Sequence, residues 1–152
     1  MNNNPNTTEE TASKQFVNFT LDSDVYGLDI MMVEAIERIT DITSVPKTPD
    51  YVLGVTNIRG DIIPVINLRK RLDMDDRAYD DKTRIIICKF DDYRIGIVVD
   101  MVKDVFTVFE KNIQMGKDIF KDRKNDFISK VIELQGDYIL VLDLEKTLDL
   151  GE

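Results

Sequence analysis

The chain's 152 residues are 43% hydrophobic and 32% charged, which is typical of a folded globular protein and not of a disordered one. Acidic residues outnumber basic ones, 29 to 20, and the net charge of −9 argues against binding of nucleic acid or of an anionic membrane surface. The chain has no histidine and one cysteine, which excludes imidazole-activated nucleophiles, imidazole metal ligands and thiolate zinc clusters. We therefore expect no catalytic site, no metal site and no cofactor.

The amino-terminal residues 1–14 are polar, and we expect a disordered tail there with no signal peptide. No stretch of the chain approaches the roughly 18 apolar residues of a membrane span, so direct membrane insertion is not expected. Cys88 lies in the apolar run 85–90, where we expect it to pack as a small hydrophobic residue in a reducing compartment. These features predict a cytoplasmic protein.

The ordered part of the chain opens with two segments of alternating character. Within residues 16–21 and 26–30, one set of apolar side chains recurs at every second position, which predicts half-buried strands. The polar residues 22–24 lie between the two segments and form a turn signal. The segments therefore predict a β-hairpin with one buried face.

Further along, Gly60 and Gly136 each lie between two apolar runs, which predicts tight turns that use a positive φ. Pro64 lies inside a strand-like run, so we expect that strand to be kinked or to lie at a sheet edge. Little helix is expected, except for a turn after Leu68 and another after Leu144.

The chain contains an internal repeat. Residues 16–36 match residues 85–105, and residues 58–73 match residues 134–149. The second copy is longer between its two blocks, and residues 116–126 are the natural place for the insertion. Two copies are too few for a solenoid, so the repeat favours two similar small units packed together.

The repeat and the strand signals define the expected architecture. We predict an all-β fold over residues 15–150, as one domain made of two pseudo-repeats at about 15–75 and 83–150. Short strands at close spacing favour one small β-barrel for each copy.

Clusters of charge are interpreted as solvated surface. The paired acids at 75–76, 80–81 and 91–92 fall in polar connecting stretches, where we expect nothing to shift a carboxylate pKa. They lack the alternating acids and central glycine of a calcium loop. The basic run 69–71 is interpreted as a solvated helix face and not as a phosphate site.

Positions that differ between the copies are freer to serve function than those they share. Arg59 matches Gln135, and Asn57 matches Glu133, so only the first copy carries the turn sequence NIRG. The planar guanidinium of a turn arginine suits carboxylates and carbonyls of a partner. The alternative is an exposed arginine without a partner, and both interpretations stay open on composition.

Several of these segments resemble the CheW family. The most specific are PDYVLGVTNIRG at residues 49–60 and IPVINLR at residues 63–69, supported by YGLDIMMV at 26–33 and GIVVD at 96–100. The resemblance extends from about Phe16 to Leu148. It implies two SH3-like five-stranded β-barrels packed through a hydrophobic interface, in agreement with the repeat.

The resemblance also implies partners. It implies binding to the CheW-like regulatory domain of the histidine kinase CheA and to the cytoplasmic tip of methyl-accepting chemoreceptors. It implies assembly of coupling protein and kinase into receptor arrays at the inner membrane, where the adaptor controls kinase activity without catalysis.

Site residues are carried over by position. The receptor-facing positions of the family fall on Val33, Gly54, Asn57, Arg59, Gly96 and Val105. The family's ring contact with the kinase falls in the insertion of the second copy, on Ile119 and Phe120. Packing roles are the alternative for the two valines and two glycines, and Ile119 and Phe120 could instead fold back onto the barrel.

This chain departs from the family at Ala35, where a glutamate that can pair with the arginine usually stands. Either Glu34 or Glu37 replaces it, or Arg59 is left for a partner. Glu34 is the poorer replacement, because adjacent residues of a strand point to opposite faces.

Alternative functions remain at this level. A CheW-like adaptor of a twitching or other surface-motility system would carry the same motif. A CheV-like protein would need a receiver domain, and we expect none because the sequence stops at Glu152. A small-barrel nucleic-acid binder would need a basic, aromatic-lined groove, which the charge of −9 argues against.

Overall fold

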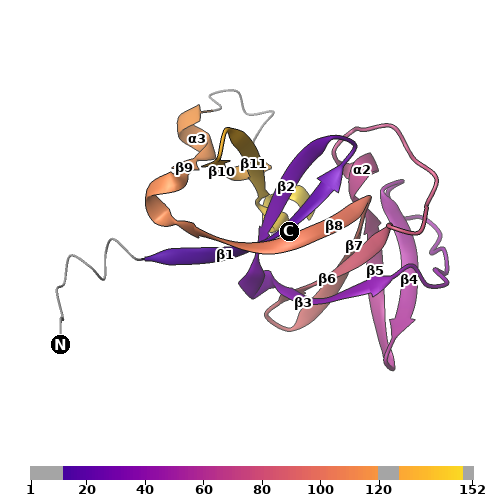
Figure 1. Ribbon diagram of the computed structural model, residues 1–152. Helices are drawn as coiled ribbons and strands as arrows, with labels where there is room; N and C mark the ends of the chain where they lie inside the picture. Colours follow the sequence, from indigo (N-terminus) through magenta and orange to yellow (C-terminus); the bar gives the residue numbers. More distant parts are fainter. Residues whose placement is uncertain (1–11, 120–126, 149–152) are drawn as a thin grey trace. The chain divides into compact units, whose positions relative to one another are not determined.

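The computed structural model describes residues 12–119 and 127–148, and these residues form mainly β-strands (Figure 1). The strands are β1 (Ser13–Leu21), β2 (Asp24–Asp29), β3 (Val33–Arg38), β4 (Val52–Ile58), β5 (Asp61–Asn67), β6 (Arg84–Phe90), β7 (Tyr93–Val99), β8 (Met101–Phe109), β9 (Ile113–Met115), β10 (Ile128–Leu134) and β11 (Asp137–Leu142). Short helices are α2 (Leu68–Arg71), α3 (Gly116–Ile119) and α4 (Leu144–Leu148), with 3₁₀ turns η1 (Ile30–Met32) and η2 (Glu110–Asn112). Among the described residues, no helix has the length and apolar character needed to span a bilayer.

The chain divides into two compact units. The central unit comprises residues 19–24 and 31–103, and it contains a five-stranded sheet with the order β3-β6-β7-β5-β4. The described part of the terminal unit comprises residues 12–18, 25–30, 104–119 and 127–148. The six-stranded sheet, with the order β8-β1-β2-β11-β10-β9, supplies the strands of the terminal unit. The all-β prediction is confirmed, and the short strand β9 gives the second sheet six strands in place of the expected five.

Each unit has its own apolar core, which the strand alternation builds. In the central unit, one cluster of buried core residues comprises Ile63, Val65, Ile85, Ile87 and Val98. In the terminal unit, a corresponding cluster comprises Phe16, Val108, Ile132, Ile139 and Val141. Side chains of this kind release roughly 1.5–3 kcal/mol each on full burial, so these positions drive folding of their own unit.

The two sequence copies are shared between the units. The central unit combines β3, β4 and β5 of the first copy with β6 and β7 of the second, through a parallel pairing that places Val65 opposite Gly96. The terminal unit repeats this arrangement, with Val141 of β11 opposite Gly27 of β2. These pairs occupy matching repeat positions, so the repeat predicted equivalent strands. The arrangement differs from one barrel for each copy, because alternation identifies strands but not their partners.

Both predicted tight turns are present. Arg59 and Gly60 have φ values of 52° and 91°, and they join β4 to β5 as a two-residue turn. Gln135 and Gly136 have φ values of 54° and 85°, and they join β10 to β11 in the same way. Positive φ at both central residues defines a type I′ turn, whose twist matches that of the strands.

Other local predictions have mixed outcomes. The helical turns after Leu68 and Leu144 are confirmed as α2 and α4. Pro64 does not lie on an edge strand, because β5 is flanked by β7 and β4. The pairing of β5 with β7 begins only at Val65, so proline's missing N–H is not required on that side.

The start of β1 also differs from the expected tail. The strand begins at Ser13, so residues 13–14 are extended and paired within a sheet and are not part of a disordered tail. Residues 1–11 lie outside the described residues. Such a boundary difference is of the size by which strand ends commonly vary.

Candidate functional site

The candidate site is the turn that carries Arg59, at one end of the central unit's sheet. Asn57 Oδ1 accepts a hydrogen bond from the Gly60 backbone N–H at 3.0 Å, which braces the turn from inside. The Arg59 side chain is 78% exposed, and its Nη2 lies 3.1 Å from Glu37 Oε2 on β3. The Arg59 guanidinium is therefore in contact with Glu37 and is still exposed enough to bind a partner.

The structure resolves which acid takes the place of the missing family glutamate. Residues of β3 alternate in burial, so Ala35 and Glu37 share the inward-facing set. Ala35 packs against the central core. Glu37 is two residues further along β3, so its side chain lies on the same face, and it contacts Arg59. Glu37 Oε2 is buried without a well-aligned hydrogen bond, and Arg59 at 3.1 Å is the cation that compensates its charge.

Glu34 has a different partner, as its position on the strand suggests. The pairing of β3 with β6 shifts register between Val33 and Ala35, so Glu34 lies in a β-bulge. A bulge re-aims the side chain of the extra residue. Glu34 Oε1 lies 2.7 Å from Arg94 Nε on β7 and leaves Arg59 to Glu37.

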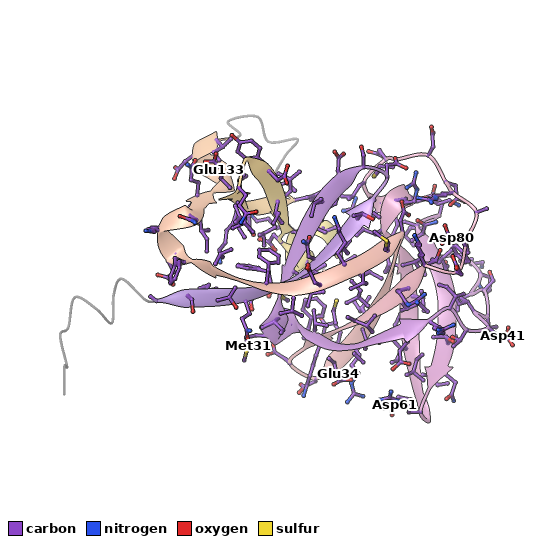
Figure 2. The ribbon with its side chains drawn as sticks, in the orientation of Figure 1. Met31, Glu34, Asp41, Asp61, Asp80 and Glu133 are labelled. Carbon is purple, nitrogen blue, oxygen red and sulfur yellow. The ribbon has the colours of Figure 1, made fainter. Side chains whose placement is uncertain are left out.

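Arg94 has a second acidic contact at the turn itself. Its Nη1 donates to Asp61 Oδ2 at 3.0 Å, and Asp61 closes the type I′ turn opposite Ile58. Figure 2 labels Glu34 and Asp61 at the same end of the central unit. The hydrogen bond and charge of Glu34, with a smaller contribution from Asp61, raise the pKa of Arg94 above its ordinary value. The result is a charged cluster of Glu34, Glu37, Arg59, Asp61 and Arg94.

The other predicted receptor-facing residues are distributed over the fold. Val33, Gly54, Asn57 and Gly96 lie in the central unit together with Arg59, whereas Val105 belongs to the terminal unit. Val33 is half-buried on β3, and Val105 is 48% exposed on β8. Asn57 supports the Arg59 turn through its side chain.

Gly54 and Gly96 have packing reasons to be glycine. A Cβ on Gly54 would collide with the carbonyl oxygen of Thr43, which bonds to β4 in an isolated bridge. The φ of Gly54 is 143°, a region that L residues rarely occupy. A Cβ on Gly96 would lie 2.7 Å from Ile85 Cγ2 in the core. The space around each backbone therefore accounts for glycine at both positions.

The predicted kinase contact falls partly within the structure. Ile119 ends α3, is 41% exposed, and lines a hollow of about 390 Å³ on the terminal unit. The remaining lining residues come from β9, β10 and β11: Gln114, Val131, Glu133, Tyr138 and Leu140. Phe120 lies outside the described residues. Ile119 is therefore packed on one side and accessible on the other.

The basic run 69–71 is not a solvated helix face, contrary to the sequence interpretation. The Arg69 side chain is only 8% exposed, and its Nη1 lies 2.8 Å from Asp100 Oδ2 and 3.0 Å from Asp22 Oδ1. Burial would lower the pKa of Arg69, but the bonds and charges of Asp22 and Asp100 outweigh it and raise the pKa. Lys70 lies near Asp76, and the Arg71 guanidinium lies over the ring of Tyr51.

Asp100 is the centre of this second cluster. Its Oδ2 accepts from the Asp22 backbone N–H at 2.7 Å, from Arg69 Nη1 and from Arg77 Nη1 at 2.9 Å. These contacts fasten the segment 73–83, which carries Arg77, to the central unit. The arrangement is structural, since every charge in it faces another within the unit.

The acids of this segment correct a further expectation. The pKa of Asp76 lies below its ordinary value, chiefly because the Arg77 backbone N–H and the Asn67 side chain donate to it. The pKa of Asp80 is also lowered, first by the backbone N–H of Lys82. Neighbouring N–H donors can therefore shift an exposed carboxylate without any apolar pocket.

Cys88 matches its prediction. It is fully buried in β6, and desolvation raises the pKa of its thiol to about 12. Within the described ranges, no group of three or more acids or cysteines lies together in a way that could hold a metal ion.

Sequence reasoning singled out Arg59 but missed Arg94. The partner acids of Arg94 come from β3 and β5, which lie far apart in sequence, and no local pattern joins them. The nearest sequence signal for this cluster was Asp61, an acid at the end of the first turn that matches Asp137 at the second turn.

Comparisons with known proteins place this chain in a family. A family model described as the CheW-like domain matches residues 15–152. The chemotaxis protein CheW of Klebsiella aerogenes is 33% identical over 143 residues, which cover 94% of this chain and 86% of that protein. The chemotaxis protein CheW of Bacillus subtilis is 31% identical, with 94% and 92% covered. The chain belongs to the CheW-like domain family.

A solved relative confirms the fold class. The crystal structure of the scaffolding protein TtCheW from Thermoanaerobacter tengcongensis has a TM-score of 0.83 at 30% identity, and it covers 92% of this chain and 95% of that one. The prediction of a CheW-type, all-β protein with two SH3-like subdomains is confirmed. The family is one of chemotaxis scaffold or adaptor proteins and not of enzymes.

Proposed function

We propose that this chain is a non-catalytic adaptor that couples the cytoplasmic tips of methyl-accepting chemoreceptors to the histidine kinase CheA. Family membership supports the scaffold role, and the exposed, turn-mounted Arg59 supports the receptor contact. Of the five N–H donors of its guanidinium, the contact with Glu37 occupies one side only. The rest can donate to carboxylates and carbonyls of a receptor helix, and such charge-assisted bonds are the stronger kind.

Coupling requires more than tethering. A scaffold can bias kinase activity only when its contacts differ in strength between the two signalling states of the receptor. Arg59 meets this requirement when a receptor shift moves the receptor's acceptor groups relative to the N–H donors that Glu37 leaves open, because the strength of a charged hydrogen bond depends on its distance and angle. The difference in binding free energy between the two receptor states then biases the array.

The kinase contact is proposed for the other unit. Ile119 at the end of α3, with Phe120, offers an apolar pair to the regulatory CheW-like domain of CheA. Tyr138 is 61% exposed and lines the same hollow as Ile119, so a partner's apolar side chain would be buried there against an aromatic ring. Interfaces draw most of their binding energy from such clustered apolar and aromatic groups.

The receptor proposal is tested with Arg59→Ala against Gln135→Ala, the matching residue of the second copy's turn. We expect Arg59→Ala to weaken binding of a purified chemoreceptor tip fragment about tenfold or more, as the loss of a charged hydrogen bond of about 1.5–3 kcal/mol predicts. Gln135→Ala should bind as the unchanged protein does. Equal affinity of all three proteins, with intact folding by circular dichroism, would show that Arg59 does not hold the receptor.

The kinase proposal is tested separately. Ile119→Ser with Phe120→Ser should weaken binding to the CheA regulatory domain while receptor binding and melting temperature change little. Met115→Ser is the matched control, because Met115 is 44% exposed on β9 and does not line the hollow. Arrays that assemble normally with the double variant would contradict the assignment.

A further inference from the structure

Arg94 connects β3, the strand that carries Glu37, with β5, the strand that begins directly after the turn that carries Arg59. In the sheet order β3-β6-β7-β5-β4, strand β3 and strand β5 are separated by β6 and β7, so no backbone bond joins them. From β7, Arg94 reaches Glu34 of β3 at 2.7 Å and Asp61 of β5 at 3.0 Å. Its guanidinium is the bridge between these two strands at the end of the sheet where Arg59 lies.

Both attachment points are close to the receptor-facing pair. Asp61 follows Gly60 directly, so Arg94 holds the last residue of the turn that presents Arg59. Glu34 lies in the bulge of β3, which is an edge strand of this five-stranded sheet. Glu37 lies further along the same strand. A hairpin end and a bulged edge strand are the places where a sheet is least constrained by backbone bonds.

We infer that Arg94 is a positioning residue, whose ion pairs with Glu34 and Asp61 hold the β4–β5 turn against β3 so that Arg59 is presented in a fixed geometry. This inference rests on the proposed receptor contact of Arg59. A long side chain on a mobile turn loses conformational entropy when a partner binds it. A turn that is held in advance removes part of that loss, so Arg94 strengthens binding without touching the partner.

The chain offers a matched control for Arg94. Lys89 faces Arg94 across the β6–β7 pairing and is exposed, and no ion pair involves it among the described residues. Lys89→Ala therefore removes one positive charge from the neighbouring position while leaving the bridge intact. Any effect of net charge on receptor association is common to both variants.

The decisive experiment is a double-mutant cycle of Arg59→Ala and Arg94→Ala, with binding of the purified chemoreceptor tip fragment as the first readout. We expect Arg94→Ala to weaken binding roughly two- to fivefold, as partly exposed ion pairs predict, and Lys89→Ala to have little effect. In the Arg59→Ala background, Arg94→Ala should cause no further loss, because there is no guanidinium left to position.

The second readout needs no partner. Amide hydrogen exchange of residues 57–61 in the free protein should become faster in Arg94→Ala and stay unchanged in Lys89→Ala. An Arg94→Ala loss of the same size with and without Arg59 would overturn the inference, and so would unchanged exchange in the turn. If Arg59→Ala itself leaves binding intact, the receptor proposal fails, while the exchange result still decides whether Arg94 holds the turn.

Discussion

The hairpin–helix block at residues 52–71 and the matching block at residues 128–148 share one backbone design. Each has a register shift at the same repeat position, a type I′ turn, and a short helix after the second strand. Even the helix caps correspond, because Asn67 Oδ1 accepts from Lys70 N–H and Asp143 Oδ1 accepts from Lys146 N–H, both at 3.2 Å. The shared residues specify the shared backbone.

The two blocks differ in their charged contacts. Arg59 and Arg69 of the first block pair with acids, whereas Gln135 and Glu145 stand at the matching positions of the second. Among the described residues, no ion pair forms at the second turn. The two blocks thus share a backbone design but differ in their surface charges. Among the described residues, only the first block has both a buried ionic cluster and a turn that carries an arginine.

The largest difference between the blocks should appear at Arg69 and Glu145. Arg69→Ala leaves buried Asp100 with less compensation, and breaking a buried ion pair in this way costs about 3–5 kcal/mol. Glu145→Ala alters an exposed helix position and should change the free energy of unfolding by less than about 0.5 kcal/mol. Urea unfolding followed by circular dichroism measures both. Similar midpoints for the two variants would mean that the Asp100 cluster does not stabilise the fold.

The next difference concerns Gly54 and its repeat mate Lys130. Gly54→Ala should destabilise the protein by about 2–4 kcal/mol, because the new Cβ meets the Thr43 carbonyl and the backbone is already at a positive φ. Lys130→Ala should be close to neutral, since the second block accepts a side chain at that position. Thermal unfolding compares the two, and a neutral Gly54→Ala would show that the Thr43 segment can move away.

The turns themselves should respond alike. A Cβ added to Gly60 or Gly136 would meet no atom within 4 Å, so the cost of alanine is that of the left-handed backbone alone. We expect Gly60→Ala and Gly136→Ala each to lower the free energy of unfolding by about 1–2 kcal/mol. Unequal losses in the same denaturation assay would show that the two turns are not equivalent despite their shared geometry.

The smallest effect on stability is expected from acid pH, at the segment of residues 73–83 that follows the first block. The pKa values of Asp76 and Asp80 lie below their ordinary value of 3.8, so the stability from these carboxylates is present above that pH. It is lost as pH falls through their lower folded values. NMR shifts of residues 73–83 should therefore change at acid pH, and Asp76→Asn should weaken the change. Titration midpoints of Asp76 and Asp80 at or above pH 3.8 would contradict this prediction.

The burial of Cys88 needs no comparison between blocks. With a thiol pKa raised to about 12 and a fully buried side chain, it resists alkylation at neutral pH. Loss of this protection therefore reports unfolding of β6 in any of the variants above.

Local patterns predicted the local features well. The glycines at both turns and the apolar run around Cys88 depend on neighbours within a few residues, and both predictions were confirmed. The strand at residues 16–21 was also confirmed, but its single buried face was wrong, because Phe16, Val17, Phe19, Thr20 and Leu21 are all buried. Arg59 was also identified from sequence, because it distinguishes one copy of a repeated turn from the other. Its role as a receptor contact stays a prediction.

Contacts between distant segments could not be predicted in this way. Arg69 was assigned to a solvated face because its immediate neighbours are charged, yet Asp22 and Asp100 bury it from other parts of the chain. The replacement of the family glutamate by Glu37 depended on which face of β3 is turned toward the β4–β5 turn. Alternation narrows that choice to two faces and leaves it open until the partner strands are known.

By itself, the sequence determined an all-β chain written twice, with matching turns, no histidine and a family signature between residues 49 and 69. Each of these properties follows from short-range spacing or composition. Only the tertiary structure decided that each unit draws strands from both copies, that Arg94 ties β3 to the Arg59 turn, and that Asp100 gathers two arginines. The physical reason is that strand pairing and ion pairs depend on distance in space, and one-dimensional periodicity does not encode that distance.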